Sequence, residues 1–129
     1  MGRMAFRKKQ RADVGCWALA LPRPGVLHVR KRGPALRYEE IRKIAQGLLA
    51  QQLDQTLSEI VFDFSNVREI VAPWTPVVAQ LIDFARQSHA ACRITALHGR
   101  PAAIVALLLG DGVCRELLHI EDLPAPSLN

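Results

Sequence analysis

Short apolar runs alternate with longer stretches of helical periodicity along this chain. Residues 15–21 and 26–30 are apolar runs on either side of a turn that contains Pro and Gly, which predicts a β-hairpin. Apolar residues then recur at about 3.6-residue spacing over residues 36–53, which predicts an amphipathic helix. Residues 59–64 form a continuous β-branched and aromatic run, as in a central strand buried on both faces.

The second half of the chain continues this alternation. We expect a helix over residues 75–88, with Thr75 as the N-cap and Pro76 as the first helical residue. A strand over residues 93–98 and a helix over residues 101–109 follow, and residues 113–120 are either a short helix or a strand. Strands that alternate with helices predict an α/β fold, with a mixed sheet and helices packed on it.

The length of 129 residues fits one domain, and half of the residues are apolar. We expect a flexible basic tail over residues 1–13, a folded domain over 14–121 and a C-terminal tail over 122–129. Trp17, on the first strand, is expected in the core. No apolar run approaches the roughly 18–20 residues that span a bilayer, so we expect a cytoplasmic protein without a transmembrane segment.

The net charge of +5 is distributed unevenly. Five basic residues precede residue 12, and residues 23–43 carry seven basic and two acidic groups, whereas residues 54–129 carry five basic and nine acidic groups. Because the chain is not uniformly basic, we expect no specific nucleic-acid binding. The basic tail is either solvated or in peripheral contact with anionic lipid. Arg30, Lys31 and Arg32 either extend that patch, contact an acidic partner or form a polar hairpin end.

Residues that commonly serve in catalysis or metal binding are scattered. Cys16, Cys92 and Cys114 lack the spacing of a disulfide framework or a zinc site, and we interpret them as free thiols. The four histidines do not pair at metal-ligand spacing on one helix. We interpret Asp63, at the end of a strand, as a hydrogen-bond acceptor for the following turn. We therefore expect no enzyme, no metal and no cofactor.

The middle of the chain resembles a known family. Residues 60–67, IVFDFSNV, are similar to the "vvlDlsgV" strand of STAS domains, the sulfate transporter and anti-sigma factor antagonist domains. Residues 110–118, GDGVCRELL, are similar to the family's "tGldrll" ending, and the order of elements agrees over residues 15–120. The resemblance implies a small α/β domain with helices mainly on one side of a mixed sheet. It also implies protein binding rather than catalysis.

In bacterial members of this family, the domain docks on a kinase-like anti-sigma factor. The partner phosphorylates a Ser or Thr in a D-S-[ST]-G motif of the domain, and this phosphorylation dissociates the complex. The resemblance places the docking surface at the N-terminus of the helix after the "DlsgV" strand, here at Val71, Ala72, Pro73, Trp74 and Thr75. Ala72 stands at the phosphoacceptor position and has no hydroxyl group. A phosphate would add a charge of about −1.5 to −2 and disrupt a packed interface. Because Ala72 cannot be phosphorylated, the resemblance implies binding without this regulation.

Several interpretations stay open at this point. Thr75 is either an N-cap or an alternative phosphosite. Trp74 either forms part of a docking surface or covers apolar side chains of the sheet. The family also includes cytosolic subunits of phospholipid-transport ABC systems, so a membrane transport assembly is the alternative function. Binding of a nucleotide or another small ligand is a third.

Overall fold

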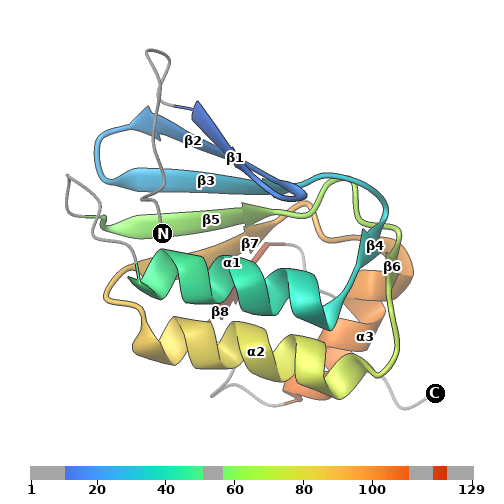
Figure 1. Ribbon diagram of the computed structural model, residues 1–129. Coiled ribbons are helices and arrows are strands. Elements are labelled where there is room, and N and C mark those ends of the chain that lie inside the picture. Colours follow the sequence, from blue (N-terminus) through green and yellow to red (C-terminus); the bar gives the residue numbers. More distant parts are fainter. Residues whose placement is uncertain (1–10, 51–56, 111–117, 122–129) are drawn as a thin grey trace.

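The computed structural model describes residues 11–50, 57–110 and 118–121, and within them a six-stranded mixed sheet carries three helices. In spatial order the strands are β1 (Arg11–Val14), β2 (Trp17–Arg23), β3 (Val26–Lys31), β5 (Glu59–Asp63), β7 (Ala91–Thr95) and β8 (Leu118–Ile120). β1, β2 and β3 are antiparallel neighbours, and β3, β5, β7 and β8 are parallel neighbours (Figure 1). The predicted α/β class and mixed sheet are confirmed.

The helices α1 (Tyr38–Ala50), α2 (Trp74–Gln87) and α3 (Gly99–Leu109) connect the parallel strands. Each crossover advances in the same direction along the sheet, and right-handed crossovers of this kind place their helices on the same face. In Figure 1, α1 and α2 lie side by side over one face, and α3 packs against α2. In the described part of the chain, no helix has the length and apolar character needed to cross a membrane.

The predicted hairpin of β2 and β3 is confirmed, and a further strand precedes it. Gly15 and Gly25 have φ values of +57° and +82°, which residues with a Cβ rarely adopt, so each allows a tight turn between antiparallel strands. β1 begins at Arg11, which pairs with Ala20 of β2. Residues 11–13, which we expected in the tail, are therefore part of the sheet, and residues 1–10 lie outside the described residues.

The core lies between the sheet and the helices. It is mostly aliphatic, with one cluster of aromatic rings whose centroids lie 5.6–6.3 Å apart, formed by Trp17, Phe62, Phe64 and Phe84. The prediction that Trp17 is a core residue is confirmed, because only 2% of it is exposed. β5 buries Ile60 and Phe62 toward the helices, but its alternate residues are only half-buried. The expectation that this strand is buried on both faces is therefore wrong.

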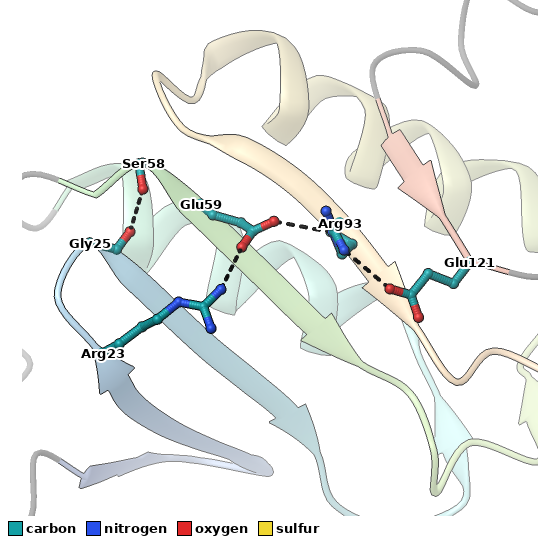
Figure 2. A network of polar contacts seen from close by, with 6 residues as sticks. All are labelled: Arg23, Gly25, Ser58, Glu59, Arg93 and Glu121. Atoms are coloured by element: carbon teal, nitrogen blue, oxygen red, sulfur yellow. Dashed lines mark hydrogen bonds and ion pairs between the residues drawn. The ribbon is translucent and has the colours of Figure 1, made fainter.

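The opposite face of the sheet is polar. Figure 2 shows a network of ion pairs there, in which the carboxylate of Glu59 lies between the guanidinium groups of Arg23 and Arg93. Arg93 also pairs with Glu121, which follows β8. Because successive strand residues point to opposite faces, these charges sit opposite the core without entering it.

The ends of several elements differ from the sequence prediction. Leu36 belongs to the short strand β4 (Ala35–Leu36), which pairs with β6 (Glu69–Ile70), so the helix predicted from residue 36 begins at Tyr38. The strand predicted over 93–98 ends at Thr95, because Ala96 has a φ of +62°. The uncertain stretch 113–120 ends in strand β8, and residues 113–117 lie outside the described residues, as do 51–53 of the first predicted helix.

The N-cap of α2 is Pro73, so the assignment of this role to Thr75 is wrong. Pro73 has extended backbone angles, φ −75° and ψ 139°, and the chain becomes helical at Trp74. Proline is favoured at the first helical position, so Pro76 predicts a helix that begins there with Thr75 as its N-cap. Proline is tolerated throughout the first turn, however, because the N–H groups there have no acceptor within the helix.

Candidate functional site

The five residues of the predicted docking segment lie at one edge of the sheet. β3, β5 and β7 are parallel, so their carboxyl ends meet at this edge, and the chain leaves β5 there to reach β6 and the start of α2. Figure 1 shows β4, β6 and the beginning of α2 together on this side of the molecule. In open α/β sheets, this edge is where binding sites usually form.

Backbone pairing holds the docking segment in place. The N–H of Val71 donates to the carbonyl of Leu36 over 2.9 Å, continuing the pairing of β6 with β4. Ile70, 4% exposed, is a buried anchor just before the segment. The peptide bond between Ala72 and Pro73 is cis, and both residues are exposed. A buried anchor and a fixed backbone thus present short apolar side chains to solvent.

Trp74 is half-buried at the first position of α2. One part of it packs against the edge of the core, while part of the residue stays exposed. The guanidinium carbon of Arg100, in the first turn of α3, lies 5.7 Å from the centre of the Trp74 ring, within the range of a cation–π interaction. Trp74 therefore covers apolar side chains and also contributes to the surface.

A second arginine lies beside this pair. Arg68 donates from Nη1 to the carbonyl of Ser65 and to Nε2 of His98, both over 3.0 Å. Since a guanidinium only donates hydrogen bonds, Nε2 of His98 is the acceptor, and its Nδ1–H donates to the carbonyl of Ala96 over 2.9 Å. Because His98 and Arg100 are close in sequence, Arg68 and Trp74 lie within one continuous cluster.

We name this cluster the edge surface. It consists of Arg68, Val71, Ala72, Pro73, Trp74, Thr75, His98 and Arg100. Sequence reasoning missed Arg68, His98 and Arg100, which come from two other segments of the chain. The signal that could have found them is the flanking pattern, because Val67, Ile70 and Leu97 are buried and force their charged neighbours outward.

The structure supplies no hydroxyl group at the phosphoacceptor position. Ala72 is exposed, and Thr75 is the nearest exposed hydroxyl residue of the predicted segment, in the first turn of α2. Asp63 accepts a hydrogen bond from the Ser65 N–H over 2.9 Å, which confirms its predicted role in the turn. Its other carboxylate oxygen lies 3.4 Å from Nε2 of His28.

The basic run at the end of β3 does not form one patch. Lys31 is buried, with Nζ 3.5 Å from the carboxylate of Glu40 and a hydrogen bond to the carbonyl of Arg32. Arg30 is exposed, and Arg32 pairs with Asp13. Of the three residues that we expected to extend the basic patch, contact an acidic partner or form a polar hairpin end, Lys31 is therefore withdrawn from the surface, because its position on the core face of β3 turns it toward α1.

The two described cysteines are free thiols, as predicted. Burial raises the pKa of the Cys92 thiol to about 11. Burial, followed by a hydrogen bond with Glu40, also raises the pKa of Cys16 above its ordinary value. Cys114 lies outside the described residues. Neither described thiol is therefore activated as a nucleophile. Within the described ranges, no three His, Cys, Asp or Glu residues gather in a way that would hold a metal ion.

Scans of this chain against family models, curated proteins and solved structures found no match. We therefore infer the chemistry of a binding partner from the residues of the edge surface. That surface combines a half-buried Trp, exposed apolar side chains and two exposed arginines. Aromatic, apolar and arginine side chains are typical of the surfaces through which proteins contact other macromolecules.

Proposed function

We propose that this chain is a non-enzymatic protein-binding module of the STAS type, which acts as an anti-sigma factor antagonist in a bacterial partner-switching pathway. It docks through the edge surface, and its partner is an anti-sigma factor or a related serine kinase-like protein. The order of elements and the helices over one face of a mixed sheet support this proposal, because the sequence resemblance implies both.

The position of Trp74 carries the proposal. The residue stands at the first position of the helix after β5, where the resemblance places the docking surface. It is fixed by core packing on one side and by Arg100, and it remains partly open to solvent. Tryptophan and arginine are the residues most enriched among binding hot spots. A side chain that is already ordered also loses less entropy on binding.

With Ala72 at the phosphoacceptor position, the proposed docking surface lacks the phosphorylation that releases the partner in the family. The residue is exposed at the centre of the segment but cannot accept a phosphate. We therefore propose that the complex persists when its partner is an active kinase. Thr75 is the remaining phosphosite candidate within the segment, and mass spectrometry of the chain after incubation with the partner and ATP would detect its modification.

Co-purification from the native cell tests the docking surface. Wild-type chain and Trp74→Asp are compared, and bound proteins are identified by mass spectrometry. We expect an anti-sigma-type kinase with the wild type and its loss with Trp74→Asp, because a charge in the middle of an apolar contact is costly. Leu49→Asp is the matched control, since Leu49 is also an exposed apolar residue but lies in the last turn of α1.

Each variant is first shown to be folded by circular dichroism and thermal unfolding. Ala72→Glu provides a second test on an exposed residue, where substitution leaves the core intact. Full partner affinity in folded Trp74→Asp and Ala72→Glu would contradict the proposal. Recovery of an ABC ATPase or a membrane subunit instead of a kinase would favour the transport-assembly alternative.

A further inference from the structure

Two positively charged side chains of the edge surface have no carboxylate partner in the part of the chain that the structure describes. Arg68 and Arg100 are exposed, and among the described residues neither guanidinium has a carboxylate partner. The guanidinium groups of Arg23, Arg32 and Arg93 each pair with one. Among the described residues, Arg68 donates to the Ser65 carbonyl and to Nε2 of His98, and Arg100 lies over the Trp74 ring. Arg42 and Arg86 also lack a carboxylate partner there, but Arg42 lies within α1 and Arg86 in the last turn of α2, whereas Arg68 and Arg100 belong to the edge surface.

The helix ends at this edge add to the positive potential. α2 and α3 both begin here, and neither has an acidic residue in its first turn or a side-chain hydrogen bond at its N-cap. α1 differs, because Glu39 and Glu40 lie in its first turn. A helix N-terminus carries a partial positive charge that nearby carboxylates stabilise. The first turns of α2 and α3 therefore lack the acidic groups that the first turn of α1 contains.

This concentration of positive charge contrasts with the surrounding sequence. Residues 54–129 carry nine acidic and five basic side chains, yet Arg68 and Arg100 both reach the edge surface. Arg37, exposed directly after β4, lies next to Val71 in the backbone pairing. Glu69 is the one acidic residue between Ser65 and Thr75, and its side chain is exposed. Glu39 and Glu40 follow Arg37 in the first turn of α1, so the positive charge of the edge surface itself comes from Arg68 and Arg100.

From this arrangement we infer that the partner presents an acidic peptide segment to the edge surface, with carboxylates received by Arg68 and Arg100 and an apolar side chain placed against Trp74. Arginine binds carboxylates in a bidentate manner, which gives orientation as well as affinity. A nucleic acid or a membrane fits less well, because Arg68 and Arg100 alone offer few phosphate contacts. The inference rests on the proposed function and specifies the chemistry of its partner.

Fluorescence anisotropy with a defined probe tests this inference. The probe is a fluorescein-labelled 12-residue peptide of alternating Glu and Leu, compared with the same peptide carrying Gln in place of Glu. We expect the full chain to bind the acidic peptide, and the double variant Arg68→Gln/Arg100→Gln to weaken that binding about tenfold or more. The Gln peptide should bind weakly to both proteins.

The matched control is the double variant Arg42→Gln/Arg86→Gln. These arginines are also exposed without a carboxylate partner among the described residues, and their loss changes the net charge by the same amount. We expect this control to stay within about twofold of the wild type. Equal weakening in both double variants would show diffuse charge attraction and overturn the inference. Equal binding of both peptides, or no binding of either, would also overturn it.

Binding of the native partner to the two variants distinguishes a failure of this inference from a failure of the proposed function. If the partner is lost with Trp74→Asp but binds Arg68→Gln/Arg100→Gln at full affinity, docking at the edge surface stands and the acidic segment is refuted. If the partner is retained by Trp74→Asp, the proposed function itself fails. Tighter, arginine-dependent binding of single-stranded RNA or anionic vesicles than of the acidic peptide would also overturn the inference.

Discussion

The guanidinium carbon of Arg100 lies 5.7 Å from the centre of the Trp74 ring, so a cation–π interaction links the first turn of α3 to the first turn of α2. The contact joins the helices that follow the neighbouring parallel strands β5 and β7. It fixes the Trp ring at the edge of the core and places a positive charge next to it. Local stability and the proposed binding function therefore depend on the same pair of residues.

Removing the arginine of this pair should cost little stability. We expect Arg100→Ala to lower the free energy of unfolding by about 0.5–1 kcal/mol, the usual value of a cation–π contact at an exposed site. Urea denaturation measures the change. Arg86→Ala, at the other end of α2, is the control and should have no measurable effect. Equal destabilisation by both variants would mean that the ring contact contributes nothing.

The buried ion pair of Lys31 and Glu40 should be more sensitive. The Lys31 side chain is 3% exposed and that of Glu40 is 25% exposed, and the N–H of Arg37 also donates to this carboxylate over 3.0 Å. Loss of one partner leaves the other charge buried, so we expect Glu40→Gln to cost about 2 kcal/mol, less than a fully buried pair because Glu40 is partly solvated.

A double variant separates the attraction between Lys31 and Glu40 from the cost of leaving the Lys31 ammonium buried without a partner. Lys31→Met replaces the buried ammonium by an apolar side chain of similar length, so Lys31→Met/Glu40→Gln should recover most of the stability lost in Glu40→Gln. Chemical denaturation of the wild type, both single variants and the double variant completes the cycle. Additive losses in the double variant would show that Lys31 and Glu40 do not interact.

The ion network on the opposite face of the sheet should contribute only weakly (Figure 2). Glu59 lies 3.1 Å from Arg93 and 3.9 Å from Arg23, whose side chain is 71% exposed. We expect Glu59→Gln to lower stability by less than about 1 kcal/mol, and the loss to shrink in high salt. Arg23→Gln should be neutral. A loss of several kcal/mol that does not depend on salt would contradict this interpretation.

The buried thiol of Cys92 should make the chain less stable in alkaline solution. Its pKa is raised from 9.0 to about 11 in the folded state, so between these pH values the folded thiol keeps a proton that the unfolded thiol releases. The unfolded state then binds fewer protons, and stability falls as the pH rises, by about 1.4 kcal/mol per pH unit.

Comparison with Cys92→Ala isolates this effect from other groups that titrate in the same range. The free energy of unfolding is measured by urea denaturation at several pH values between 8 and 11. We expect the advantage of the wild type over Cys92→Ala to decrease steadily above pH 9. A difference that stays constant with pH would show that the thiol has an ordinary pKa in the folded chain.

Much of the fold follows from local patterns. The hairpin, the strand after residue 58, the helices and the burial of Trp17 were predictable, because apolar spacing and turn residues act over a few positions. β4 and β6 were not, since each has two residues and exists only because the other lies beside it. Lys31 was not recognised as buried either, because its neighbours Arg30 and Arg32 made the segment look solvent-exposed.

The sequence by itself determined the α/β alternation and placed the segment for which we propose docking, residues 71–75, at the start of one helix. It also determined that Ala72 offers no hydroxyl group. Only the tertiary structure decided which charges surround that segment, because His98 and Arg100 reach it from the connection between β7 and α3 and from the start of α3, and His98 contacts Arg68 there. The physical reason is that parallel strands bring their carboxyl ends to one edge, and contacts between such distant residues leave no local pattern in the chain.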